Sequence, residues 1–126
     1  MVKKKLHRVF AYGTLKNGFY FHDEYLGGDK SVFGGPARTT NEYTLYVDGM
    51  PHMVREAGEH GVKGELYEVD DDVLAKLDSL EGHPVVYKRE IIEVLDETGN
   101  KTLAWSYLRP VHFKGRTRCW IEEEYL

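Results

Sequence analysis

Along most of the chain, hydrophobic and polar positions alternate in short runs, which is the pattern of β-strands. The run at 62–69 shows this clearly, because small or apolar residues at 62, 64 and 66 alternate with polar residues or tyrosine at 63, 65 and 67. Glycine, proline, asparagine and aspartate separate the runs, as expected of turns. The pattern predicts strands over 8–11, 30–40, 43–47, 51–55, 62–69, 87–95 and 102–108.

Glycine and proline add detail to these strands. Gly34 and Gly35 predict a bend or bulge in the strand over 30–40. Pro51 has no N–H to donate to a sheet, so we expect 51–55 to be an edge strand, reached from 43–47 through a hairpin-type turn at 48–49. A second turn, at 99–100, is expected to join the last two strands.

One segment has helical periodicity instead. Asp70 is a suitable N-cap, Asp71 and Asp72 favour the positive end of a helix, and Gly82 followed by Pro84 ends it. The apolar residues that fall on one face are Val73, Leu74, Leu77 and Leu80. A single helical turn is also expected at 22–26. The sequence therefore predicts an α+β fold, in which one main helix and short helices accompany a small, mostly antiparallel sheet curled into a β-barrel.

Composition indicates one globular domain spanning 1–126. Of the 126 residues, 41% are hydrophobic and 13% aromatic, which argues against disorder. The net charge of −4 gives no reason to expect a nucleic acid or an anionic membrane surface as partner. Cys119 is the single cysteine, so an internal disulfide is excluded and a reducing compartment is favoured.

The same composition bears on location and cofactors. No apolar run approaches the ~20 residues that span a bilayer, and His7 and Arg8 interrupt the start of the chain, so no signal peptide is expected and the protein is predicted to be cytoplasmic. The six histidines lack metal-ligand spacing. We therefore expect no metal site. The chain is expected to form a monomer or small homo-oligomer.

Two stretches could carry chemistry. The first is Tyr12-Gly13-Thr14-Leu15, directly after the apolar strand, where Gly13 allows close approach of the backbone and successive N–H groups can converge on a carboxylate or phosphate. An ordinary strand followed by a turn is the alternative. The second is Glu81 at the helix end, where apolar neighbours would raise the pKa of its carboxyl group and make it a usable base. An exposed end-of-helix carboxylate is the alternative there.

Taken together, these stretches resemble a known family. Tyr12 to Leu15 after a strand, then Leu77-Asp78-Ser79-Leu80-Glu81-Gly82, then Tyr87 and Arg89, resemble the γ-glutamylcyclotransferase superfamily, and within it the AIG2-like, γ-glutamylamine cyclotransferase-type branch. The resemblance covers nearly the whole chain, and the motifs occur in the expected order and separation. Thr14 stands where many members carry serine, which preserves the hydroxyl group.

The resemblance implies an enzyme that needs no cofactor. It would fold a γ-glutamyl compound so that the α-amine attacks the γ-carbonyl, giving 5-oxoproline and a free amine. Main-chain N–H groups of Tyr12, Gly13, Thr14 and Leu15 would grip the α-carboxylate, and Glu81 would be the general base. Tyr87 would orient the substrate or the glutamate, or else it is a core-facing tyrosine.

Other interpretations stay open at this point. A binding module could use the same cradle to hold a small carboxylate without turnover. An enzyme with a related acyl chemistry, the removal of a γ-glutamyl protecting group in a biosynthetic pathway, would recognise the acyl half of its substrate in the same way. Arg89 is interpreted as an exposed or structural arginine in preference to a second substrate clamp.

Overall fold

The computed structural model describes residues 5–12, 25–48, 50–58, 61–110 and 117–118. Gly13, Thr14 and Leu15 of the expected cradle lie outside these ranges, as does most of the expected helical turn at 22–26. The statements below concern the described residues.

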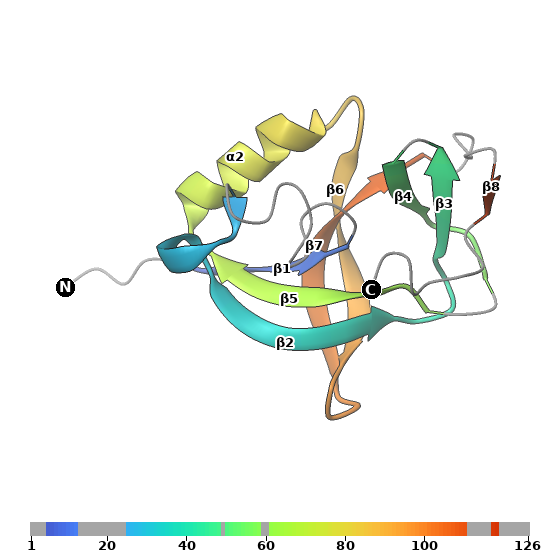
Figure 1. Cartoon of the computed structure of the whole chain (residues 1–126), viewed down its shortest axis with the longest axis horizontal. Coiled ribbons are helices and arrows are strands. Elements are labelled where there is room, and N and C mark those ends of the chain that lie inside the picture. Colours follow the sequence, from blue (N-terminus) through green and yellow to red (C-terminus); the bar gives the residue numbers. More distant parts are fainter. Residues whose placement is uncertain (1–4, 13–24, 49, 59–60, 111–116, 119–126) are drawn as a thin grey trace.

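One eight-stranded sheet dominates the structure (Figure 1). Its strands follow each other in the order β1-β5-β2-β6-β7-β4-β3-β8. Their bounds are β1 His7–Ala11, β2 Val32–Thr39, β3 Thr44–Asp48, β4 Met50–Val54, β5 Lys63–Val69, β6 Lys88–Asp96, β7 Lys101–Arg109 and β8 Thr117–Arg118. The helical elements are the 3-10 helix η2, Gly28–Lys30, and the α-helix α2, Asp71–Glu81.

The sheet closes on itself through its first strand. β1 pairs with β5 in antiparallel fashion and also meets β7 in parallel fashion, with Val9 opposite Trp105. The strands β1, β5, β2, β6 and β7 therefore form a closed ring, while β4, β3 and β8 extend from β7 to one side (Figure 1). Only the β1–β7 and β4–β7 pairings are parallel among the described strands, so the predicted, mostly antiparallel barrel is confirmed.

The expected bulge is present in β2. Phe33 lies opposite Tyr67 and Gly35 opposite Leu66, so the register shifts by one residue between them. Gly35 has φ +101°, a conformation that residues with side chains rarely adopt. The extra residue bends β2 where it wraps around the barrel, as the two glycines predicted.

The prediction that 51–55 is an edge strand is wrong. β4 lies between β3 and β7, with Pro51 opposite Val47 on one side and Met53 opposite Leu108 on the other. The parallel pairing with β7 is limited to residues 53 and 54, so it begins beyond the proline. Proline is therefore compatible with an interior strand here, because the ladder that would need its N–H has not yet started.

The main helix begins and ends where the sequence predicts. The Asp70 side chain accepts a hydrogen bond from the N–H of Val73 at 2.9 Å, which caps the N-terminus of α2. At the other end Gly82 adopts the left-handed conformation, with φ +67°, and its N–H returns to the carbonyls of Asp78 and Ser79. Both ends are thus fixed by neighbouring residues.

The strand β1 is buried on both faces. Phe10 of β1 and Leu66 of β5 point into a core that fills the barrel and continues under β3 and β4. Val9 and Ala11, the alternate residues of β1, lie in a second cluster with Leu74 and Leu77 of α2. The helix therefore packs on the outside of the barrel, and its C-terminal end leads into the turn before β6 (Figure 1).

Candidate active site

Glu81 is the last residue of α2, at a sharp change of chain direction. Its main-chain carbonyl accepts a hydrogen bond from the N–H of Tyr87 at 3.1 Å, and that of Gly82 accepts one from the N–H of Val86 at 2.8 Å. A Cβ atom on Gly82 would lie 2.8 Å from Cγ2 of Val86, closer than such atoms approach. A glycine is therefore required directly after Glu81, and the turn folds Tyr87 back beside it.

The carboxyl group of Glu81 is largely withdrawn from water. Burial raises its pKa from the ordinary value of 4.5 to about 7, because an ionised carboxylate loses hydration there. Within the described part of the chain, no hydrogen bond or ion pair to this carboxylate is found. A carboxyl group with these properties can take up and release a proton near neutral pH.

Tyr12, the first residue after β1, lies at the same place. Its hydroxyl group donates to the carbonyl of Tyr107 and accepts a hydrogen bond from the N–H of Met53 at 3.0 Å. The pKa of the Tyr12 phenol is raised well above its ordinary value, first by burial and then by the charges of Tyr87 and Glu81. The phenol therefore stays protonated, and Tyr12, the first residue of the predicted cradle, lies within electrostatic range of Glu81.

Tyr87 completes this group. It packs against the core cluster beneath α2, and its pKa is raised by burial and then by the charge of Glu81. The guanidinium of Arg109 lies 5.0 Å from the centre of its ring and donates from Nη1 to the carbonyl of Val86 at 3.0 Å. Tyr87 thus packs against the core, and its phenol lies within electrostatic range of Glu81. Its role in orienting the substrate or the glutamate stays a prediction.

Asp78 and Tyr107 are two site residues that the sequence analysis did not single out. The Tyr107 hydroxyl donates to Oδ1 of Asp78 at 2.7 Å, and Arg89 donates from Nη1 to Oδ2 at 3.0 Å. Arg89 therefore has a structural partner, as the sequence interpretation favoured. A signal for Asp78 was available, since an acid three residues before Glu81 occupies the same helix face. The sequence contained no such signal for Tyr107 beyond its place in a predicted strand.

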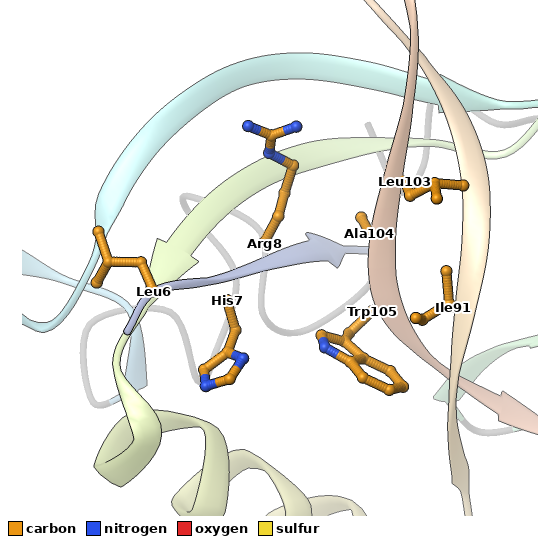
Figure 2. Close-up of a pocket in the computed structure, with 7 residues that line it drawn as sticks. All are labelled: Leu6, His7, Arg8, Ile91, Leu103, Ala104 and Trp105. Atoms are coloured by element: carbon orange, nitrogen blue, oxygen red, sulfur yellow. The ribbon is translucent and has the colours of Figure 1, made fainter. Parts of the chain in front are cut away.

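A separate groove lies between β1 and β7 (Figure 2). It has a volume of about 160 Å³ and is lined by apolar side chains together with His7 and Arg8. Of the described residues that line it, none carries a carboxylate, and Tyr12, Glu81 and Tyr87 are not among them. This groove is therefore distinct from the candidate active site.

The described residues also bear on two other expectations. Among them, no group of three or more histidine, cysteine, aspartate or glutamate side chains is arranged to hold a metal ion. No helix in the described ranges is long and apolar enough to cross a membrane.

Comparison with known proteins identifies the family. The sequence model described as "Gamma-glutamyl cyclotransferase, AIG2-like" matches residues 9–125. The chain belongs to the AIG2-like γ-glutamyl cyclotransferase family. The motifs from which the sequence resemblance was drawn lie within the matched residues, so the resemblance is confirmed.

Individual members of the family are similar over most of this chain. A candidate γ-glutamylcyclotransferase of Methanocaldococcus jannaschii is 38% identical over 102 residues, which cover 81% of this chain and 83% of the relative. The γ-glutamylaminecyclotransferase of Bos taurus is 38% identical over 96 residues, covering 71% of this chain and 57% of the relative. The crystal structure of an AIG2-like protein from Mus musculus superposes with a TM-score of 0.73 at 31% identity, covering 82% of this chain and 76% of that one.

Proposed function

We propose that this protein is a γ-glutamylcyclotransferase that uses Glu81 as its general base and acts on a γ-glutamyl amine, peptide or isopeptide. The observation that carries this proposal is a largely buried carboxyl group with a pKa of about 7, beside Tyr12 and Tyr87. Membership of the family supports the reaction class. The name of the bovine relative supports an amine as the leaving group.

In this reaction the substrate's α-nitrogen attacks its own γ-carbonyl carbon. Glu81 removes a proton from the α-ammonium, and a new C–N bond closes a five-membered ring. The bond from the carbonyl carbon to the leaving nitrogen breaks as that nitrogen receives the proton from Glu81. The ring nitrogen then gives up its second excess proton, which the released amine also takes up to leave as an ammonium group. The products are 5-oxoproline and an amine, so atoms and charges balance without any further reactant.

The chain's own residues would divide the remaining tasks. Main-chain N–H groups of Tyr12, Gly13, Thr14 and Leu15 would bind the α-carboxylate, because consecutive N–H groups form a concave anion site. Tyr87 would orient the substrate or the Glu81 carboxylate through its hydroxyl group. Alignment of the attacking nitrogen with the carbonyl carbon can lower the activation barrier by about 7–11 kcal/mol. A general base increases the rate roughly 10²–10⁴-fold. Substrate positioning is therefore the larger contribution.

A pKa near 7 favours catalysis over simple binding. A module that only held a carboxylate would gain nothing from a second, poorly hydrated acid next to its ligand, since that acid would repel the ligand when ionised.

The single cysteine, Cys119, is the ground for also proposing a cytoplasmic, reducing location.

The proposal is tested by incubating the protein with a panel of γ-glutamyl amines, amino acids and peptides and measuring 5-oxoproline by mass spectrometry. We expect release from at least one compound, loss of release in Glu81→Gln, and normal release in Glu93→Gln, whose carboxylate pairs with Lys101 at the surface. A Glu81→Gln variant with normal turnover would remove Glu81 from the mechanism. Tight binding without product across the panel would instead support the binding module.

A further inference from the structure

Asp78 occupies an unfavourable position for an acid. It lies three residues before Glu81, so both side chains leave the same side of α2 at its C-terminal end. The helix dipole disfavours negative charge at this end, and no basic residue of the last turn compensates it. Partners from outside the helix must therefore stabilise the Asp78 carboxylate.

Two strands supply those partners. Oδ1 of Asp78 accepts a hydrogen bond from the hydroxyl group of Tyr107 on β7, and Oδ2 accepts one from Arg89 on β6. The side chains of Arg89 and Asp78 are only 20% and 24% exposed, so water screens this ion pair much less than a surface pair. Both carboxylate oxygens are thus fixed, each to a different strand of the barrel.

Arg89 is itself held in place. Its guanidinium lies 4.5 Å from the centre of the Trp105 ring, a cation–π contact. Its main-chain N–H donates to Nδ1 of His83 at 2.9 Å, and the N–H of His83 donates to the carbonyl of Asp78 at 2.9 Å. The end of α2 and the turn after it are therefore tied to β6 through one connected set of bonds.

Tyr107 connects this set to the active site. Its hydroxyl group binds Asp78, while its main-chain carbonyl accepts the hydrogen bond from the Tyr12 hydroxyl. The charge of Glu81 is among the causes that raise the pKa of Tyr107, after burial and the contacts with Asp78, so the two side chains are within electrostatic range of each other. One residue thus links the start of the cradle to the helix that carries the base.

We propose that Asp78 is a positioning residue whose carboxylate, held by Tyr107 and Arg89, fixes the last turn of α2 against β6 and β7 so that the Glu81 side chain stays in its buried place beside Tyr12. This inference rests on the proposed function. Without the contacts of Asp78, the last turn can move away from the strands, and the Glu81 carboxylate gains hydration and loses its alignment.

The first test is Asp78→Asn, which keeps the shape of the side chain and removes its charge. We expect kcat to fall on the order of 10²-fold, the effect of a small misplacement of a catalytic group, while KM changes little because the cradle after β1 is untouched. We also expect the pKa of the Glu81 carboxyl group, followed by ¹³C NMR, to fall from about 7 toward 4.5.

The second test is Tyr107→Phe, which removes one donor to Asp78 and keeps the carbonyl that Tyr12 uses. The matched control is Tyr67→Phe, because Tyr67 lies in the same core cluster and its hydroxyl group donates to Glu65 and not to Asp78. Asp72→Asn, in the first turn of α2, controls for the loss of charge from the helix. Both controls should leave the Glu81 pKa unchanged. If Asp78→Asn does not fold, Tyr107→Phe decides the question.

The NMR titration needs no substrate, so it separates this inference from the proposed function. If the wild-type protein releases no 5-oxoproline, the proposed function fails, and a lowered Glu81 pKa in Asp78→Asn and Tyr107→Phe still supports the positioning role. An unchanged Glu81 pKa in these variants overturns the inference. An unchanged kcat in folded variants of an active wild type overturns it as well.

Discussion

The hydroxyl group of Tyr12 accepts a hydrogen bond from the main-chain N–H of Met53, 41 residues away along the chain, at 3.0 Å. The same hydroxyl group donates to the carbonyl of Tyr107. It therefore bridges β4 and β7 at the point where the predicted cradle begins. Met53 is fully buried, so its N–H has no access to water as a substitute acceptor.

Tyr12→Phe should accordingly destabilise the protein and also lower its rate of turnover. Removing the hydroxyl group leaves a buried N–H without an acceptor, and we expect the free energy of unfolding to fall by about 1–3 kcal/mol in urea denaturation. The control is Tyr43→Phe, whose hydroxyl group accepts from the partly exposed Arg55 side chain and should matter less. Equal losses in the two variants would contradict this account of the bridge.

The pH dependence of turnover should report Glu81 directly. Because the base must be ionised and its pKa is raised to about 7, kcat should increase tenfold per pH unit below that value and level off above it. Steady-state kinetics between pH 5 and pH 9, in buffers of constant ionic strength, measure this. An acid limb centred near 4.5 would mean that the carboxylate is hydrated as in an ordinary glutamate.

The stability of the protein should also depend on the ionisation of Glu81. Its pH dependence should be opposite to that of kcat, because stability falls as the pH rises. Between pH 4.5 and about 7 the folded state keeps the Glu81 proton while the unfolded state has lost it, so this contribution to stability is complete below 4.5 and is lost as the pH rises through 7. A glutamine side chain at this position would remain neutral throughout. Glu81→Gln should therefore gain stability over wild type on raising the pH from 4 to 8, by about 3 kcal/mol. Chemical denaturation of both proteins at the two pH values measures this difference, and parallel curves would contradict it.

Gly82→Ala should disturb the helix end that carries the base. An alanine there must adopt φ +67° and place its Cβ 2.8 Å from Cγ2 of Val86, so we expect a loss of more than about 1–2 kcal/mol together with a fall in kcat. Gly28→Ala is a close control, since Gly28 has φ +61° and a Cβ there would meet nothing within 4 Å. The difference between the two variants in thermal unfolding isolates the clash with Val86. If Gly28→Ala loses as much stability, the clash contributes nothing.

The sequence by itself determined the features that depend on a few neighbouring residues. Asp70 and Gly82 set the ends of α2, the glycines at 34 and 35 set the bulge of β2, and alternation set the strands of the barrel. Glu81 could be singled out because the helix end that presents it is encoded locally. The identity of the fold family followed from short motifs in a fixed order.

Only the tertiary structure decided which distant residues meet. Strand order placed β4 inside the sheet although Pro51 suggested an edge, because the parallel pairing with β7 starts two residues later. The bond from Tyr107 to Asp78 and the bridge from Tyr12 to Met53 span 29 and 41 residues. Such contacts depend on how the closed barrel and the helix pack against each other, and local secondary-structure propensity does not determine that packing. The burial that raises the pKa of Glu81 has the same origin, since desolvation depends on all the atoms around the carboxyl group and not on its neighbours in sequence.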